Sequence, residues 1–446
     1  MRGLTKPRRV AALAGAALVT FVLTGTPVVS SASAAAHTTV TWWTWTANPK
    51  DVIANFEKAN PGITVPTPPD LGVSGSGFYE KLTTALAGGT APCVAQVEYS
   101  ELPYYIDAHD LLNVARYADQ YKSDYPAWVW GQVSQGSGVY ALPEDIGPTG
   151  FMYQPAVYKK YHLVVPATWA QFASDAVALH KADPNMYLDF FSPTDEHRLT
   201  SLWWQAGARP FALQPNGSWK ITINGPVEKK VTNFFGDLAA KGDLLFDTDF
   251  TAPYGHHVAD DTYASMVGTA WGPGYLVAGF LPKGSTQQWA VAPLPQWTAG
   301  AHAEGSWGGS TNAVTKDCPA QDVAAAVKFA AFINTSASGM TIDEKPATST
   351  GGGRGLFPAA VARASVAQFN APVPNFTGNV NAQFNTYASQ VVENFEWGPF
   401  DTEFNNFFGT EMTKAAAGKQ SWDQALDNIE SDVVNYARSV GYTVES

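Results

Sequence analysis

The chain has 446 residues, a formal net charge of −12 and an aromatic content of 13%. An acidic surface repels nucleic acid and anionic lipid, and no basic stripe runs along the chain, so nucleic-acid binding is excluded. The length is too great for one ordinary core and predicts two domains, while two cysteines allow a single disulfide without requiring it.

The first 36 residues have the pattern of a cleaved secretory signal. Four basic residues precede an apolar run over 10–29, and small residues at A-x-A spacing follow within 32–36. An N-terminal membrane anchor is the alternative, but Gly25 and Pro27 interrupt the apolar run. The segment contains no cysteine, so we expect an exported protein without a lipid anchor. Removal of the four positive charges takes the formal net charge to −16.

Strands and helices alternate in the part of the chain that follows. The segment VTWWTW (Val40–Trp45) has the aromatic and β-branched content of a strand that is buried on both faces. The next predicted elements are a helix over 51–60, a strand over 63–65, a glycine-rich loop over 72–77, a helix over 78–87 and a strand over 94–99. This alternation predicts an α/β fold.

The same alternation continues to the C-terminus. The later predicted elements are strands over 139–143, 151–153 and 311–314, and helices over 168–182, 229–240, 322–334 and most of 402–437. Between the first two of these strands, the segment EDIGPTG is a candidate hinge because it contains both proline and glycine. We find no repeat and no low-complexity linker, so the two domains are not simple beads on a string.

The order of these segments resembles that of the extracellular solute-binding proteins of ABC sugar importers, the family that includes maltose-binding protein. The resemblance covers the mature chain and rests on VIANFEKANPGITV, FYEKLTTALAGGTAPCVAQVEYSELPYY, VYALPEDIGPTGFMYQPAVYKKYHLVVPATWAQF, GTAWGPGY and SWGGSTNAVTKD. Two features depart from the family pattern. Cys93 stands where relatives usually carry aspartate, and the lipid-modified cysteine that often follows the signal is absent.

The resemblance implies a two-lobed periplasmic-binding-protein-like α/β fold with a ligand cleft between the lobes. It assigns residues 37–143 and 306–341 to the first lobe, and residues 144–305 and 342–446 to the second. It further implies a sugar or oligosaccharide ligand, ABC permease subunits as partners, a monomer, an extracellular or periplasmic location, and no enzymatic activity, cofactor or metal. Both Cys93 and Cys318 fall in the first lobe, where a disulfide between them is predicted.

Tryptophans in glycine-containing loops are the first candidates for ligand contact. The chain has 15 tryptophans, more than a core requires. An indole covers the apolar face of a pyranose, while carboxylates or amides bind its hydroxyls. The candidates of this kind are Trp271 with Gly272, Trp307 with Gly308, and Trp397; packing of each ring onto its own lobe is the alternative.

Strand ends and the crossover supply the other candidates. Ligands bind at the carboxyl ends of strands in open α/β sheets, which favours Trp45, Thr46 and Glu101. A carboxylate at the crossover can accept two hydroxyl hydrogen bonds, which favours Glu144. The remaining candidates are Trp204, since only one of two adjacent helical tryptophans is expected to face the cleft, and Arg354 in GGGRG.

Two other functions stay open. A secreted glycan-cleaving enzyme needs two carboxylates about 5–9 Å apart, and Glu393 with Glu396 or Asp401 with Glu403 are possible pairs. No G-x-S-x-G, H-E-x-x-H or phosphate-loop motif is present, and the pair His256-His257 matches no zinc pattern. A lectin that is not linked to transport would have the same binding site, so only a neighbouring permease gene would distinguish it.

Overall fold

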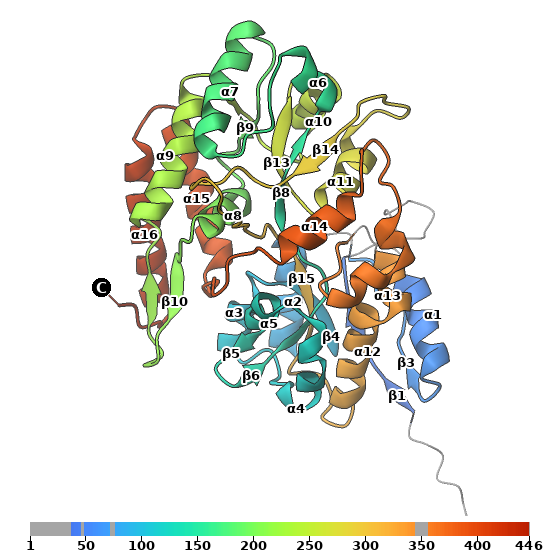
Figure 1. The fold of residues 1–446 in the computed structure, drawn as a ribbon. Coiled ribbons are helices and arrows are strands. Elements are labelled where there is room, and N and C mark those ends of the chain that lie inside the picture. The colour runs from blue at the N-terminus through green and yellow to red at the C-terminus, as the bar shows by residue number, and fades with distance from the viewer. Residues whose placement is uncertain (1–36, 46–48, 72–75, 344–355, 446) are drawn as a thin grey trace, which may run out of the picture. The chain divides into compact units, whose positions relative to one another are not determined.

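The computed structural model describes residues 37–45, 49–71, 76–343 and 356–445. The signal segment and the candidates Thr46 and Arg354 lie outside the described residues. The described chain is a mixed α/β fold with two principal sheets (Figure 1). Among these residues, none of the helices combines the length and the apolar character that a bilayer span needs.

The first sheet has four strands in the order β2 (Trp42–Trp43), β4 (Val94–Glu98), β15 (Ser310–Val314) and β7 (Ala141–Pro143). Strand β2 is parallel to β4, whereas β15 is antiparallel to both β4 and β7. The sheet is therefore mixed rather than purely parallel. Its most distant partners in sequence, β4 and β15, are paired over five residues each.

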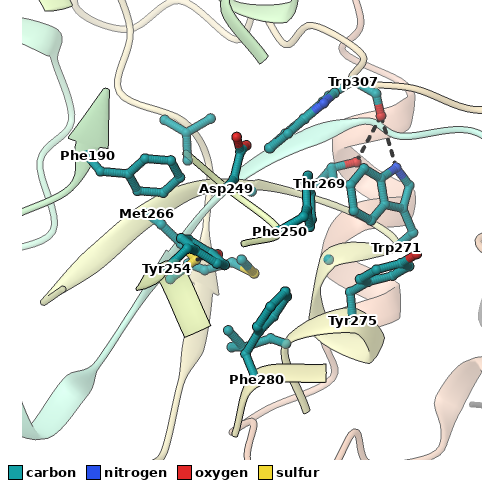
Figure 2. Close-up of a pocket in the computed structure, with 15 residues that line it drawn as sticks. Phe190, Asp249, Phe250, Tyr254, Met266, Thr269, Trp271, Tyr275, Phe280 and Trp307 are labelled. Carbon is teal, nitrogen blue, oxygen red and sulfur yellow. Dashed lines mark hydrogen bonds between the residues drawn. The ribbon is translucent and has the colours of Figure 1, made fainter. Parts of the chain in front are cut away.

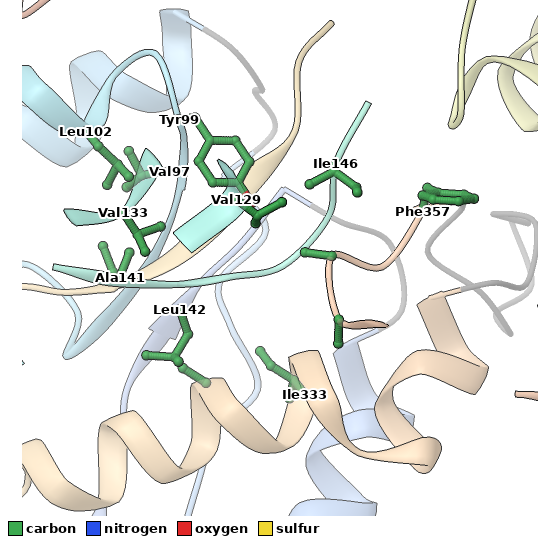
Figure 3. Close-up of a cluster of buried hydrophobic side chains, with 14 of the residues drawn as sticks. Val97, Tyr99, Leu102, Val129, Val133, Ala141, Leu142, Ile146, Ile333 and Phe357 are labelled. Carbon is green, nitrogen blue, oxygen red and sulfur yellow. The ribbon is translucent and has the colours of Figure 1, made fainter. Parts of the chain in front are cut away.

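Helices α1 (Pro49–Ala59), α2 (Ser76–Gly88) and α12 (Val323–Thr335) pack with this sheet in one hydrophobic core. Trp42 is 1% exposed, its ring meets Phe329 of α12 at 5.2 Å, and its indole N–H donates to Asn312 of β15 at 2.9 Å. Trp42 is thus a core residue whose N–H is satisfied. Figure 3 shows part of the same core, where side chains of β4, β7 and α12 meet.

The second sheet has β8 (Thr149–Tyr153) between β13 (Ser265–Thr269) and β14 (Ala290–Ala292), and all its pairings are antiparallel. A second hydrophobic core lies mainly among residues 151–294 and 400–437. The longer helices that contribute to it are α7 (Trp169–Ala182), α8 (Glu196–Gln205), α9 (Pro226–Ala240), α15 (Asp401–Ala416) and α16 (Trp422–Ser439).

The remaining described elements are short. They are β1 (Thr38–Thr39), β3 (Ile63–Thr64), α3 (Leu102–Asp107), α4 (Ala115–Ala118), α5 (Ala127–Gln132), β5 (Ser134–Gln135), β6 (Gly138–Val139), α6 (Pro155–Lys160), β9 (Phe190–Phe191), β10 (Phe211–Leu213), β11 (Trp219–Ile221), β12 (Leu245–Phe246), α10 (Ala252–Ala259), α11 (Gly272–Tyr275), α13 (Ala337–Asp343) and α14 (Val380–Ala388), with single turns at Asp119–Asp124, Leu276–Phe280, Val361–Ser365 and Ala367–Asn370.

Most predicted helices agree with the structure within a few residues, but the first strand does not. The prediction of a strand over Val40–Trp45 was too long, because only Trp42 and Trp43 pair with β4. Before this point, Val40 donates its backbone N–H to Thr64 at 2.9 Å. The chain therefore changes partner within the tryptophan-rich segment, and one continuous strand cannot form.

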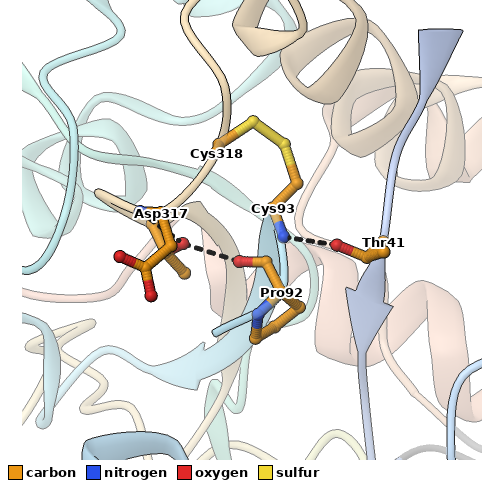
Figure 4. Close-up of a disulfide and its surroundings, with 6 residues drawn as sticks. Thr41, Pro92, Cys93, Asp317 and Cys318 are labelled. Carbon is orange, nitrogen blue, oxygen red and sulfur yellow. Dashed lines mark hydrogen bonds between the residues drawn. A yellow bond between two sulfur atoms is a disulfide. The ribbon is translucent and has the colours of Figure 1, made fainter. Parts of the chain in front are cut away.

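A disulfide joins Cys93 and Cys318, whose Cα atoms are 4.1 Å apart (Figure 4). Cys93 immediately precedes β4, and Cys318 follows β15 by four residues. Because these strands are antiparallel neighbours, the start of one lies beside the end of the other. The backbone N–H of Thr315 donates to the Cys93 carbonyl at 3.1 Å, which keeps the two segments together.

The predicted hinge segment lies beside the chain that returns to the first sheet. Glu144 donates its backbone N–H to Ser310 at 2.9 Å, and Trp307 donates its backbone N–H to Gly147 at 2.8 Å. A third segment joins them, since Ile146 donates to the carbonyl of Phe357 at 2.9 Å. Several connections between the two sheets are thus hydrogen-bonded to one another.

Candidate functional site

A pocket with aromatic walls lies beside β13 and its C-terminal end (Figure 2). Its lining includes Thr269, Trp271 and Gly272, which end β13 and begin α11, together with Phe250 and Trp307. The cavity volume is about 30 Å³, which is the space of about one water molecule. In this conformation the rings fill most of the pocket themselves.

Phe250 lies at the centre of these rings. Its ring centroid is 5.8–6.3 Å from those of Trp271, Tyr275, Phe280 and Trp307. Phe250 has a φ of 60°, a left-handed conformation that is uncommon for a bulky residue, and its side chain is 47% exposed. Tyr275 is 57% exposed. Large aromatic side chains that stay accessible together are typical of a binding surface.

Trp271 and Trp307 lie side by side rather than facing each other. Their ring centroids are 5.4 Å apart, and the Trp271 indole N–H donates to the Trp307 carbonyl at 3.0 Å. Gly308 follows with a φ of 69° and lies next to the Trp271 indole. This left-handed conformation, rather than lack of space, favours glycine at position 308.

A polar cluster, formed by Tyr79, Glu98, Glu101, Glu196, His197, Asp401 and Thr402, brings together residues from distant parts of the chain. Tyr79 of α2 donates its hydroxyl to Glu98 at 2.9 Å, and Thr402 donates its hydroxyl to Glu101 at 3.2 Å. Because Glu101 follows β4 and Thr402 lies in the first turn of α15, this bond connects the two principal parts of the fold.

The centre of the polar cluster is His197, near the start of α8. Its Nε2 lies 3.0 Å from Oε1 of Glu196 and 3.4 Å from Oδ2 of Asp401. The His197 side chain is 24% exposed, whereas Glu196 and Asp401 are 2% and 8% exposed. The imidazole therefore retains an edge toward solvent while both carboxylates are buried.

Ionisation in the polar cluster is strongly perturbed. Burial, together with the carboxylates Asp401 and Glu98, raises the pKa of Glu101 to about 8. Burial raises the pKa of Glu196 to about 7, although His197 opposes this shift. Burial alone would lower the pKa of His197, but Glu196 and Asp401 outweigh it and the pKa is raised. Groups with perturbed pKa values in a cleft are candidates for function.

Two further aromatic rings lie against the polar cluster. Trp397 meets His197 with its ring edge at 5.4 Å, and Trp45 meets Tyr79 at 6.1 Å, but neither ring lines the aromatic pocket. Asp249, which lines the aromatic pocket, faces Asp195, the residue before Glu196, and burial with this neighbouring carboxylate raises the pKa of Asp195. The arrangement can stack on the apolar face of a ligand and hydrogen-bond to its polar edge.

The predicted site residues fall into three groups. Trp271, Gly272, Trp307 and Gly308 gather at the aromatic pocket, and Trp45, Glu101 and Trp397 gather at the polar cluster. Glu144 is fully buried at the hinge, with Ser310 Oγ at 3.4 Å from its carboxylate. Ligand contact by each of these residues stays a prediction.

Trp204 packs in the protein interior in this structure. It is 2% exposed, stacks on Phe395 at 4.2 Å with an angle of 8°, and donates its indole N–H to the Val392 carbonyl at 2.6 Å. Its neighbour Trp203 is 0% exposed. The two rings point in different directions from α8, as expected for adjacent helical residues. Each ring nevertheless packs against other buried residues.

Sequence reasoning missed most of the polar cluster and the central ring of the pocket. The missed residues are Tyr79, Glu98, Glu196, His197, Asp249 and Phe250, and Asp401 was considered only as part of an enzymatic pair. One signal was present in the sequence. Glu196-His197 precedes the paired tryptophans, and Asp401 follows the loop EWGPF, so both lie next to segments already chosen as candidates.

The hinge carboxylate Asp145 gives a prediction about pH. Burial, opposed by hydrogen bonds from the hydroxyl and backbone N–H of Ser310, raises the pKa of Asp145 from 3.8 to about 6. A raised acid pKa favours the neutral form in the folded state, so its contribution to stability is full below about pH 4 and is lost as pH rises through about 6.

We expect Asp145→Asn to remove this loss of stability at higher pH, because an amide does not ionise. The amide oxygen can still accept both hydrogen bonds from Ser310. Relative to the parent, the variant should gain up to about 3 kcal/mol of unfolding free energy between pH 4 and pH 7.5. Urea unfolding at the two pH values measures the difference. If the unfolding free energies of variant and parent differ by the same amount at pH 4 and at pH 7.5, the prediction is contradicted.

Comparison with known proteins assigns a class to this combination of fold and cleft. Residues 42–340 match the model of the bacterial extracellular solute-binding protein family. The chain belongs to this family, whose members are binding proteins. Searched against curated proteins by sequence, the chain has no match.

Solved structures share the fold over nearly the whole chain. The ABC transporter associated binding protein from B. animalis subsp. lactis Bl-04, in complex with beta-1,6-galactobiose, is 25% identical, with a TM-score of 0.75 and coverage of 92% of this chain and 99% of that chain. The galacto-N-biose-/lacto-N-biose I-binding protein from Bifidobacterium longum, in complex with lacto-N-biose, is 23% identical, with a TM-score of 0.76 and the same coverage. The sugar-binding protein MalE from Xanthomonas citri is 19% identical, with a TM-score of 0.72 and coverage of 90% and 99%. The predicted two-lobed periplasmic-binding-protein-like fold class is confirmed.

Proposed function

We propose that this protein binds a sugar or oligosaccharide and delivers it to the permease subunits of an ABC importer. The observation that carries the proposal is the group of accessible aromatic rings at the pocket, whose lining residue Asp249 interacts with Asp195, the residue before Glu196 of the polar cluster. Aromatic rings cover the C–H face of a sugar, and carboxylates accept hydrogen bonds from its hydroxyls. The sugars bound by the similar proteins described above support the same class of ligand.

The location and domain organisation belong to the same proposal. The protein acts outside the cytoplasm, extracellular or periplasmic, after removal of the signal, without a lipid anchor and as a monomer. Its lobes are residues 37–143 with 306–341 and residues 144–305 with 342–446. A ligand that contacts both lobes only when they close shifts the population toward the closed state. The hydrogen bond between Thr402 and Glu101, which links a residue of each proposed lobe, supports this organisation.

Calorimetry of the purified protein with a glycan panel tests the ligand class. Beta-1,6-galactobiose and lacto-N-biose are the first ligands to try, because the similar proteins are in complex with them. We expect saturable binding near micromolar, which corresponds to about −8 kcal/mol. Product analysis of the same samples tests for catalysis. We expect no turnover, and turnover of any glycan would favour the enzyme alternative.

Replacing Trp271 by alanine should weaken sugar binding by about 1–3 kcal/mol, because a desolvated aromatic face is lost. Trp271 is only half-buried, so the melting temperature without sugar should change little. The matched control is Trp297→Ala, which removes another half-buried indole that packs against Trp169 and Lys230. The control should keep the parent's affinity. Unchanged affinity in the Trp271 variant would show that the pocket is not the sugar site.

A further inference from the structure

Three side chains of the polar cluster place metal-binding atoms close together. Glu196 and His197 begin α8, and Asp401 begins α15. One ligand atom from each side chain lies within 4.8 Å of the other two. One imidazole nitrogen and two carboxylates form a donor set that first-row divalent ions such as Zn²⁺ accept.

The distances between these atoms suit a shared ion. The His197 Nε2 atom lies 3.0 Å from Glu196 Oε1 and 3.4 Å from Asp401 Oδ2. Ligand atoms that are each about 2.0–2.2 Å from one Zn²⁺ lie about 3–3.5 Å from one another. Each carboxylate thus lies at this distance from the His197 nitrogen, and the two carboxylate atoms lie within 4.8 Å of each other.

The orientation of these groups is a separate observation. Glu196 is 2% exposed, yet neither of its carboxylate oxygens has a hydrogen-bond partner among the described residues, and neither has Nε2 of His197. His197 Nε2 approaches Glu196 Oε1 at 3.0 Å as an ion-pair contact, without the alignment of a regular hydrogen bond. A buried carboxylate without hydrogen bonds is costly, and coordination of a cation would remove that cost.

The surrounding charge favours a cation as well. Glu98 and Glu101 are further acidic groups of the polar cluster, and both interact electrostatically with Asp401 and His197. Arg198, which follows His197, is turned away and pairs with Asp189 at 2.9 Å. The His197 ring is 24% exposed, so the site lies close to solvent although Nε2 itself is buried.

We propose that Glu196, His197 and Asp401 form a binding site for a divalent metal ion of the Zn²⁺ type at the edge of the ligand cleft. Three protein ligands leave at least one coordination position open. Water or a hydroxyl of the bound ligand occupies that position. An ion pair between a protonated His197 and the two carboxylates, with no metal, is the competing arrangement.

Metal titration of the full-length mature protein separates these arrangements. Untagged protein is stripped with a chelator and titrated with Zn²⁺ against a chromophoric competitor, with no sugar present. We expect one ion per chain. Co²⁺ provides a second readout, because its visible absorption reports nitrogen and oxygen ligands directly. No bound ion under either measurement would overturn the proposal.

Variants assign the ion to this site. His197→Gln and Glu196→Gln should each weaken Zn²⁺ binding at least about 10-fold and should change the Co²⁺ spectrum. The matched control is the double variant His256→Gln/His257→Gln, which removes two histidines of α10 and should bind like the parent. Circular dichroism checks that each variant is folded. If the His197 and Glu196 variants bind Zn²⁺ as tightly as the parent does, the assignment is overturned.

The outcome for the metal does not depend on the proposed function. Metal binding to a protein that binds no sugar would count against the proposed function and leave the metal site in place. Sugar binding by a protein that binds no metal in either measurement would support the proposed function and overturn the metal site. Sugar titrations with chelator and with Zn²⁺ show whether the ion takes part in ligand binding.

Discussion

Replacing Asp189 by alanine is expected to destabilise the protein by about 3–5 kcal/mol, because it leaves a buried arginine without its partner. Asp189 and Arg198 are 1% and 3% exposed, and the guanidinium donates to both carboxylate oxygens at 2.9 and 3.0 Å. Asp189 also accepts the backbone N–H of Val267 at 2.9 Å. Urea unfolding at pH 7.5 measures the loss.

The double variant Asp189→Leu/Arg198→Met is the control for this prediction. It removes both charges and keeps apolar volume, so it should be more stable than the single variant. Because Asp189 anchors β13 below the aromatic pocket, the single variant should also bind sugar more weakly. A loss below about 1 kcal/mol in the single variant would show that Arg198 finds water or another acceptor.

Removing the disulfide should have a similar effect. Cys93 and Cys318 are 225 positions apart, and in the chain-entropy model a closed loop of this length stabilises by about 5 kcal/mol. Both residues are buried. We expect the double variant Cys93→Ala/Cys318→Ala to lose up to that amount in urea unfolding, while sugar affinity stays close to that of the parent.

Two measurements check this prediction independently. Titration of the unfolded, unreduced parent should find no free thiol, and a reductant should lower its melting temperature but not that of the double variant. Two free thiols, or an equal response of both proteins to the reductant, would contradict it.

The elements of the fold were predictable where a local pattern decides them. Helix α1 buries Val52, Ile53 and Phe56 at helical spacing, and its end before Pro61-Gly62 is visible in the sequence. The lateral order of strands was not predictable in this way, because β15 enters the sheet between β4 and β7 through contacts that no local pattern encodes. The first strand was overestimated because tryptophan content does not show where a strand changes partner.

The candidate site shows the same limit. Of the three tryptophans selected because they lie next to glycine in a loop, Trp271 and Trp307 line the pocket and Trp397 does not; ligand contact by each of them stays a prediction. The polar cluster has only a weak local signature, since its acids and its histidine come from positions 98, 101, 196–197 and 401 and meet only in the folded chain; of these, the sequence selected Glu101 as a ligand candidate. In a sequence, a glutamate of a buried cluster cannot be told from a solvated surface glutamate. Only the structure shows that it is buried next to other carboxylates.

The position of β15 has a consequence for the order of folding. Strands β4 and β7 are synthesised within the first third of the chain, but they do not pair with each other; both pair with β15, which ends at Val314. The N-terminal sheet therefore stays open until about seventy per cent of the polypeptide has been made. Contacts of such long sequence separation slow folding and leave strand edges exposed in the meantime. A nascent chain of this protein would accordingly be a good substrate for a holding chaperone, and any fragment that ends before residue 310 should fail to form a stable N-terminal half.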